Sequence, residues 1–382
     1  MGCVGREALR LAAVLAGAAV CATSSRPSAR AGDALPVPSI EWQPRQYTCC
    51  RAPVAPEIDG RLDEPAWAAA PWTEDFTDIE GPSRPAPRFR TRAKMLWDDR
   101  FLYVAAELEE PDVWATLRER DAVIYHDNDF EVFIDPDGDT HAYYELEVNP
   151  FGTEWDLLLL RPYRDGGPAV NAWDIAGLRT AVFVDGTLNR PGDADGGWTV
   201  EIALPWSVLA ECANRPAPPR HGDEWRVNFS RVEWRARPTA DGRYEKLLDA
   251  ATGKPLPEDN WVWSPQGLIA MHYPEMWGIV RFDDGQAAAR AGVPRDAGEG
   301  GAAFEPDPRH AASWELRRVY YAERNWRAAH GTYTDDLSAL GEAAGGALDG
   351  RVGVAAGDDW FVATLELSDG RVLRIREDGR VW

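Results

Sequence analysis

The feature that most limits the fold is a long succession of short strand-like runs between residues 56 and 282. Each run is alternating or continuously apolar, and turns rich in Gly, Pro and Asp separate the runs. Clear runs cover residues 92–97, 102–107, 130–135, 143–149, 180–184, 198–204, 225–232 and 278–282. Helical periodicity is weak here. Many short antiparallel strands with few helices predict a two-sheet β-sandwich, jelly-roll or immunoglobulin-like, or a barrel.

The end of the chain has a different character. Residues 283–309 are rich in Ala, Gly, Asp and Pro without apolar periodicity, which predicts a linker. Residues 311–330 repeat apolar side chains at helical spacing, and Gly331 follows as a C-cap. Strand-like runs follow at 352–355, 360–367 and 372–375. We therefore predict a small α+β unit over residues 310–382.

The helix and loop of this unit carry Tyr320-Tyr321-Ala322-Glu323 and His330-Gly331-x-Tyr333-Thr334. This pattern weakly resembles pilin-like secretion subunits, without their hydrophobic N-terminal stem. The simplest interpretation is a helix packed on a small sheet with no binding site. A protein contact or a second sugar contact is the alternative.

Residues 1–31 have the pattern of an export signal. Arg6 and Arg10 supply positive charge, an apolar run of about ten residues follows, and residues 29–31 offer a cleavage site. Cys21 allows a lipid-anchored alternative, but Val20 before it is bulkier than is usual there. No run reaches the ~18 apolar residues of a membrane span. We predict a cleaved signal peptide and a secreted or periplasmic protein.

The charge balance bears on partners. Lys and Arg number 41 and Asp and Glu 63, for a formal net charge of -22. Such a chain is repelled by phosphate backbones, so nucleic acid is not an expected partner. The 18 Trp outnumber the 11 Tyr and the 11 Phe, so many flat faces exist for a core or for ligand stacking. Oligomeric state does not follow from the sequence.

Three cysteines follow the predicted cleavage site: Cys49, Cys50 and Cys212. They allow at most one disulfide among themselves. A bridge between the adjacent Cys49 and Cys50 would need a strained ring. A bridge from either to Cys212 stays open.

Four motifs occur in order along the β region. They are Ile58-Asp59-Gly60-x-Leu62-Asp63-Glu64-Pro65-Ala66-Trp67, Leu96-Trp97-Asp98-Asp99-x-x-Leu102-Tyr103-Val104, Asp127-Asn128-Asp129-Phe130-Glu131-Val132-Phe133-Ile134-Asp135 and Gly197-Trp198-Thr199-Val200-Glu201-Ile202-Ala203-x-Pro205-Trp206. This order resembles the family 9 carbohydrate-binding modules and their secreted relatives. The resemblance implies a sugar-binding β-sandwich over residues 47–282, with calcium ions holding loops. Such modules usually accompany glycoside hydrolases, and this branch also occurs alone.

The resemblance also implies two aromatic rings that clamp a sugar. The Trp of the Leu-Trp-Asp segment is one of them, and it matches Trp97. The second position falls near residues 271–273, where no Trp stands. Tyr273 or Trp263 is then the replacement, or the sugar specificity differs. Trp97 is equally able to be a core residue, because Leu96 beside it is also apolar.

The residues themselves indicate a polar surface on the 130–149 hairpin. Strand alternation places several polar side chains on one face: Glu131, Glu145, Glu147 and Asn149. So many acids need partners such as water, arginine, a cation or ligand hydroxyls. One interpretation is a solvated sheet face. The other is a polar floor for a sugar, with Arg231 and Arg235 as counter-charges and Trp155 as a rim aromatic or a core residue.

A calcium loop is the predicted metal site. Asp135, Asp137 and Asp139 recur at two-residue spacing around Gly138 and offer several oxygens in one place. Asp and Gly are also common turn formers, so a plain turn is the alternative. No organic cofactor is expected.

The sequence does not single out any catalytic residues. A glycosidase needs two carboxyls at a fixed separation, one with a raised pKa, and the many acids here designate no pair. His126, His141 and His272 have no nucleophile in a recognisable setting and are expected to be structural hydrogen-bonders. The leading hypothesis is a non-catalytic, secreted carbohydrate-binding protein associated with carbohydrate breakdown. The alternatives are a glycoside hydrolase acting on O-glycosyl bonds, and an envelope interaction protein that binds no sugar.

Overall fold

The computed structural model describes residues 34–285 and 304–382. The predicted signal peptide, Cys21 and most of the predicted linker lie outside the described residues. Among the described residues, no helix is both long and apolar enough to cross a membrane.

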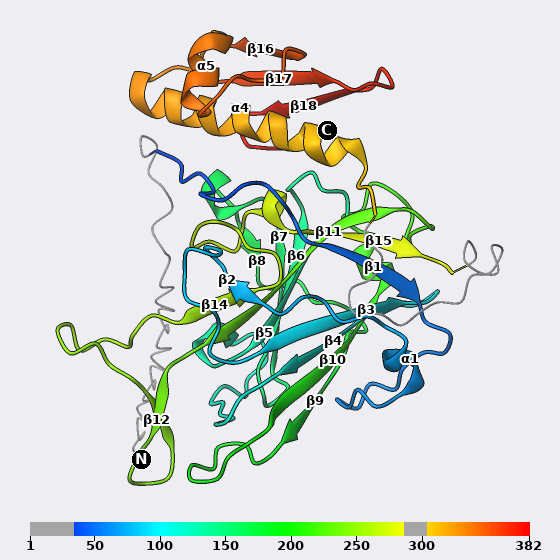
Figure 1. Cartoon of the computed structure of the whole chain (residues 1–382), viewed down its shortest axis with the longest axis vertical. Coiled ribbons are helices and arrows are strands. Elements are labelled where there is room, and N and C mark those ends of the chain that lie inside the picture. The colour runs from blue at the N-terminus through cyan, green and yellow to red at the C-terminus, as the bar shows by residue number, and fades with distance from the viewer. Residues whose placement is uncertain (1–33, 286–303) are drawn as a thin grey trace, which may run out of the picture.

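The described residues form a large β domain and a small C-terminal α+β unit (Figure 1). The strands of the β domain are β1 (Gln46–Arg51), β2 (Thr77–Asp78), β3 (Thr91–Trp97), β4 (Phe101–Leu108), β5 (Phe130–Asp135), β6 (Tyr143–Val148), β7 (Glu154–Leu159), β8 (Ala169–Val170), β9 (Arg179–Asp185), β10 (Gly197–Pro205), β11 (Glu224–Glu233), β12 (Ala236–Pro238), β13 (Tyr244–Lys246), β14 (Asp259–Val262) and β15 (Gly278–Asp283). Its helical segments are α1 (Pro65–Ala68), α2 (Trp206–Leu209) and three 3-10 turns, η1 (Ile124–His126), η2 (Tyr163–Asp165) and η3 (Pro274–Met276).

The main strands join into one curled sheet of 13 strands, in the order β8-β7-β6-β5-β11-β15-β1-β3-β4-β10-β9, with β14 and β2 attached beside β11. Side chains from β5, β6 and β11 share one apolar cluster with side chains from β3, β4 and β10. The two halves therefore face each other across a core, and the mainly β, sandwich-like prediction is confirmed. Most strand pairs are antiparallel, and β1 is the exception: it runs parallel to both β15 and β3 and so joins the two halves.

The β5–β6 hairpin is buried on both faces. Phe130, Val132 and Ile134 of β5 enter the main core, as alternation requires. Every other residue of β5 and β6 is buried as well, although several are acidic. Segments from elsewhere in the chain, including η1 and Trp277, cover this outer face.

The C-terminal unit consists of α4 (Pro308–His330), α5 (Leu337–Ala343) and the meander β16 (Val352–Ala356), β17 (Phe361–Glu366) and β18 (Val372–Arg376). The side chain of Asp307 caps the start of α4, and Gly331 ends it at φ 85°, where a side chain would be strained. Figure 1 shows α4 between the meander and the β domain. Tyr273 and Met276 of the β domain join the apolar core of this unit.

Charged groups connect the two parts. We call this group the junction: Arg164, Asp165, Glu275, Arg317 and Arg324. Arg164 Nη2 lies 2.9 Å from Glu275 Oε2 and Arg324 Nη1 lies 2.5 Å from Asp165 Oδ1. The C-terminal unit is thus tied to η2 and η3, although its status as a separate domain stays a prediction.

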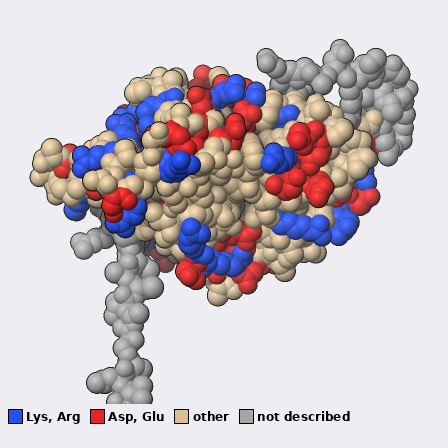
Figure 2. Space-filling view, turned by 90° about the horizontal axis from the view of Figure 1, so that it is seen from below, with Lys and Arg blue, Asp and Glu red and all other residues tan. Residues whose placement is uncertain are grey.

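Over the face turned away from the C-terminal unit, Lys and Arg side chains lie among Asp and Glu side chains (Figure 2). The three described cysteines, Cys49, Cys50 and Cys212, are free thiols, and Cys49 is buried in β1. The open question of a bridge to Cys212 is therefore answered in the negative by this structure.

Candidate functional site

Four carboxylates meet on the outer face of the β5–β6 hairpin. We call them the acidic cluster: Asp129, Glu131, Glu145 and Glu147. Glu131 stands directly opposite Glu147 in the strand pairing, as the alternation predicts. The four side chains are only 0%, 6%, 5% and 1% exposed, respectively. The interpretation as a solvated sheet face is therefore wrong, because other segments cover the hairpin.

The protein gives the acidic cluster few donors. The backbone N–H of Tyr125 donates to Glu147 Oε2 at 2.9 Å, and the N–H of Val232 donates to Asp129 Oδ1 at 3.2 Å. Among the described residues, Asp129 Oδ2 and Glu145 Oε2 have no hydrogen-bond partner. The nearest ion-pair contact to Glu145 is His272 Nε2 at 4.0 Å.

Burial and mutual repulsion act in the same direction on these carboxyls. Burial, then the neighbouring Glu131, raises the pKa of Asp129 and that of Glu145 well above the ordinary range. The pKa of Glu147 is raised by burial and then by Glu131 and Asp129. A raised pKa favours the protonated carboxyl, which donates an O–H as well as accepting, so Asp129, Glu145 and Glu147 suit both roles.

Aromatic side chains surround this floor. Trp155 pairs directly across from Glu147, and its ring lies 6.3 Å from that of Tyr125 at 30° between planes. Tyr163 is 46% exposed, and its pKa is raised by burial of the hydroxyl and then by Glu145 and Glu147. The ring of His272 lies 4.5 Å from that of Tyr163. We call Tyr125, Trp155 and Tyr163 the aromatic rim.

Of the rim, only Trp155 was expected from the sequence, and it lies half-buried beside the acidic cluster. Tyr125 and Tyr163 lie in short 3-10 turns, which have no periodicity to reveal them. His272 was expected to be structural, and its Nδ1 is indeed 2.9 Å from the hydroxyl of Tyr143. Its Nε2 nevertheless faces Glu145.

The expected counter-charges lie elsewhere. The guanidinium of Arg231 is 2.9 Å from Glu110 Oε2 and 2.9 Å from Glu233 Oε2, and the residue is fully buried. Arg235 pairs with Asp259. The expectation that these arginines balance the floor is therefore wrong, because nearer carboxylates hold them.

Asn149 is also buried, and its role is in the local turn. Its side-chain N–H donates to Leu117 O at 2.9 Å and to Asp127 Oδ2 at 3.1 Å. Its Oδ1 accepts from the backbone N–H groups of Phe151 and Thr153. It shapes the turn before β7, and through β7 the place of Trp155.

The open clamp expected around Trp97 is not observed. Trp97 is 3% exposed, its indole N–H donates to Cys49 O at 3.1 Å, and Phe282 meets its ring edge-on at 6.0 Å. Trp263 is fully buried against Gly278, where an added Cβ would lie 2.4 Å from the indole. Tyr273 is 4% exposed and stacks on Tyr321 of α4. The three rings share no open face because each fills a core, so their role as sugar contacts stays a prediction.

The predicted calcium loop does bring its acids together. One oxygen from each of Asp135, Asp137 and Asp139 lies within 4.8 Å of the others. Both oxygens of Asp135 accept backbone N–H groups, from Gly138 and Thr140. Those of Asp139 accept from the His141 N–H and from Arg380 Nε. The protein's own donors satisfy this loop, so it does not require a cation, and calcium there stays a prediction.

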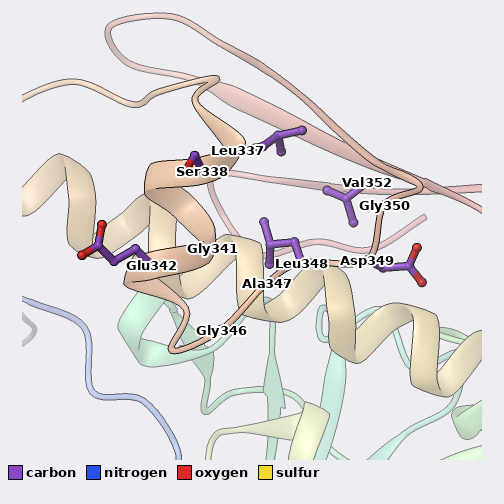
Figure 3. Close-up of a pocket in the computed structure, with 10 residues that line it drawn as sticks. All are labelled: Leu337, Ser338, Gly341, Glu342, Gly346, Ala347, Leu348, Asp349, Gly350 and Val352. Atoms are coloured by element: carbon purple, nitrogen blue, oxygen red, sulfur yellow. The ribbon is translucent and has the colours of Figure 1, made fainter.

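A hollow of about 450 Å³ lies in the C-terminal unit, away from the acidic cluster. It opens between α5 and residues 346–350, and the carboxylates of Glu342 and Asp349 point outward at its two ends (Figure 3). Asp349 is already paired with Arg351 at 2.6 Å. This hollow therefore presents no converging polar groups.

The fold and the acidic cluster define a sandwich-like β domain with a polar floor under aromatic side chains. Residues 58–222 match the family model described as "Carbohydrate family 9 binding domain-like", so the resemblance expected from the motifs is confirmed for this segment. The acidic cluster and the aromatic rim lie inside the matched segment. His272 and the C-terminal unit lie outside it.

Two curated proteins are similar over part of the chain. They are "Exoglucanase XynX" from Acetivibrio thermocellus and "Endo-1,4-beta-xylanase A" from Thermoanaerobacterium saccharolyticum, each 26% identical over 154 residues. The match covers 40% of this chain but only 12% and 11% of those proteins.

Solved structures show a distant likeness. A carbohydrate binding module family 9 from Caldicellulosiruptor kristjanssonii in complex with cellotriose is 16% identical, with a TM-score of 0.41, over 66% of this chain and 100% of that chain. A putative carbohydrate-binding protein from Bacteroides uniformis ATCC 8492 is also 16% identical, with a TM-score of 0.45, over 63% of this chain and 100% of that chain.

Proposed function

We propose that this chain is a carbohydrate-binding protein that works outside the cytoplasm and holds a sugar at the acidic cluster, beneath the aromatic rim. One observation carries the proposal: among the described residues, two buried carboxyl oxygens of the acidic cluster have no hydrogen-bond partner, while Trp155 pairs across from Glu147 of the same cluster and Tyr163 is 46% exposed. The match of residues 58–222 to a carbohydrate-binding domain family supports it.

The chemistry of a sugar fits both parts of this arrangement. Sugar hydroxyls donate to and accept from carboxyl groups, and the apolar C–H faces of the ring lie on aromatic side chains. Here Glu145 and Glu147 supply the polar contacts, and Trp155 and Tyr163 the flat faces. Because the carboxyls are deep and the rings lie beside them, an exposed ring such as Tyr163 is the first contact.

Binding is favoured over hydrolysis by the uniform state of the acids. A glycosidase needs one protonated acid and one ionised carboxylate. In the acidic cluster burial raises the pKa of Asp129, Glu145 and Glu147 alike. A raised pKa suits a general acid, but none of these three is set apart as an ionised base or nucleophile.

The test is a glycan array probed with the full chain, followed by calorimetry on the best ligand. We expect Tyr163→Ala to raise the Kd roughly tenfold, because an aromatic contact contributes about 0.5–1.5 kcal/mol beyond its buried area and 1.4 kcal/mol is a factor of ten. Trp155→Ala should act in the same direction. Trp360→Ala, a ring 46% exposed in the C-terminal unit, is the matched control and should leave the Kd unchanged.

Two results would overturn this proposal. One is a folded wild-type chain that binds no glycan on the array. The other is a sugar affinity that Tyr163→Ala and Trp155→Ala both leave intact. Release of reducing ends from the bound glycan by the wild-type chain, lost in Glu147→Gln, would replace binding alone with hydrolysis.

A further inference from the structure

The acidic cluster has the composition of a cation site. One oxygen each from Asp129, Glu131 and Glu147 lies within 4.8 Å of the other two, and all three residues are buried. Glu145 stands two residues from Glu147 on β6 and so shares its face. Oxygen-only sets of this kind suit hard divalent cations.

An acidic cluster alone is a weak indication, but two buried oxygens here lack the partners that burial demands. Asp129 Oδ2 and Glu145 Oε2 have no hydrogen-bond donor among the described residues, and the two side chains are 0% and 5% exposed. Leaving such an oxygen unsatisfied costs about 1–3 kcal/mol, and more for a charged group. An occupant that supplies positive charge removes this cost.

The chain's own Lys and Arg side chains do not neutralise Asp129 and Glu147, the two most deeply buried residues of the acidic cluster. Among the described residues, no Lys or Arg forms an ion pair with Asp129 or Glu147. Arg231 of β11 forms its ion pairs with Glu110 and Glu233, on its own side of the sheet, and not with the acidic cluster. Lys246 acts on Asp129 only through longer-range attraction, and its amine lies 3.2 Å above the ring of Trp234.

The neighbouring loop of Asp135, Asp137 and Asp139 shows the opposite arrangement within the same hairpin. Its carboxylates also lie within 4.8 Å of one another, but backbone N–H groups and Arg380 occupy the oxygens of Asp135 and Asp139. The difference lies in the donors, since both groups consist of acids on or next to the same β5–β6 hairpin. In the acidic cluster, by contrast, Asp129 Oδ2 and Glu145 Oε2 receive no hydrogen bond from the described residues.

We propose that Asp129, Glu131 and Glu147 hold a divalent cation, with Glu145 beside it, beneath the aromatic rim. Calcium uses such a set best, because it takes six to eight oxygens at flexible geometry, whereas magnesium keeps several waters. The site needs no sugar to form, so this inference goes beyond the proposed function.

The test uses the full chain, stripped with EDTA and dialysed, and the metals alone as probes. Calorimetry with CaCl₂, MnCl₂ and MgCl₂ should show one saturable site per chain for calcium or manganese. Thermal melting should show a rise in Tm of several degrees with the same ion. Glu147→Gln and Asp129→Asn should each weaken binding at least tenfold. Asp137→Asn, in the neighbouring loop, should leave both the affinity and the stoichiometry unchanged.

Folding of the variants is checked by the same melts. Glu147→Gln replaces a carboxyl buried among other carboxyls with a neutral amide of the same size, so in EDTA its Tm should equal or exceed that of the wild type. Absence of any ion binding by the wild-type chain would overturn the proposal, as would binding that Asp137→Asn abolishes and Glu147→Gln spares. These metal titrations contain no glycan, so a failure to bind the ion leaves the sugar-binding proposal standing. A chain that binds the ion but no glycan would overturn only the sugar-binding proposal.

Discussion

The junction between the C-terminal unit and the β domain collects buried acids much as the acidic cluster does, but it collects both signs of charge. Each of its carboxylates has an arginine within 4 Å, and Tyr320 and Tyr321 donate hydroxyls to Asp165 and Glu275. In the acidic cluster, among the described residues, no Lys or Arg forms an ion pair with Asp129 or Glu147. The junction pairs its carboxylates with arginines, although Asp165 Oδ2 has no hydrogen-bond partner among the described residues. For the acidic cluster, the proposal is that a cation or a sugar from outside the chain supplies the missing partners.

The contrast also shows in the protonation of the acids. Burial alone would raise the pKa of Glu275, but Arg164 and Arg317 oppose it and hold the pKa at about 2. In the acidic cluster burial acts without such opposition, and the pKa of Glu147 is raised. The same residue type therefore has a lowered pKa in one region and a raised pKa in the other.

The largest effect is expected at the junction. Glu275→Leu leaves Arg164 and Arg317 without a carboxylate they both use, and breaking a buried ion pair in this way costs about 3–5 kcal/mol of unfolding free energy. Urea unfolding followed by tryptophan fluorescence measures it. The control is Asp241→Ala, whose pair with Arg243 has side chains 56% and 81% exposed and should contribute little to stability because water screens it.

A Glu275→Leu variant as stable as that control would mean that the junction is not a buried charge network in solution. The junction also positions the rim, because Asp165 follows Tyr163 in η2 and Glu275 follows His272 in the segment leading through η3. A folded but loosened junction should therefore weaken sugar binding without touching the acidic cluster.

The opposite sign is expected in the acidic cluster. In EDTA near pH 7.5, Glu147→Gln should raise the unfolding free energy, since a carboxyl whose pKa is raised on folding lowers stability at a pH above its ordinary pKa. The amide keeps the size of the side chain and stays neutral without taking up a proton on folding, whereas burial and Glu131 disfavour the ionised form of Glu147. Urea unfolding in EDTA and in calcium measures this. Calcium should erase or reverse the gain, and a loss of stability in EDTA would contradict the assignment.

How far the sequence reaches differs between these regions. Alternation along 130–135 and 143–149 correctly placed Glu131, Glu145 and Glu147 on one face, because strand geometry is local. It could not show that this face is covered, since the covering segments, such as Tyr163 and His272, are distant in sequence. Trp97 was open to two interpretations for the same reason. Its local pattern is apolar on both sides, and only the packing of Phe282 decides that it is core.

The C-terminal helix illustrates the same limit. Its spacing and Gly331 predicted the element well, because caps and periodicity are local signals. Its docking depends on Arg317 and Arg324, whose partners Glu275 and Asp165 come from the β domain. Nothing in the spacing of an arginine on a helix indicates which distant acid it meets. The composition of the junction therefore required the structure.

The smallest expected effect is a dependence on pH that separates the two regions. A carboxyl with a raised pKa binds more protons in the folded chain, so stability falls as pH rises from its ordinary value through the raised one. The gain from Glu147→Gln in EDTA should then be small near pH 4.5 and grow toward pH 7.5. Glu275 works in the other direction, with stability present above its ordinary pKa and lost as pH falls toward about 2.

Melts of both variants against the wild type across this range measure the two slopes. The charged groups that act on the cluster from neighbouring segments are Asp127, Lys246 and His272, and they are common to the wild type and to Glu147→Gln. The titration of these three groups therefore largely cancels when the stability of the wild type is subtracted from that of Glu147→Gln. A Glu147→Gln gain that is flat with pH would mean that Glu147 is ionised throughout, which requires a cation that EDTA does not remove. Acid treatment would strip such a tightly held cation. Calorimetry on the stripped chain then shows whether the acidic cluster takes the cation up again or binds none.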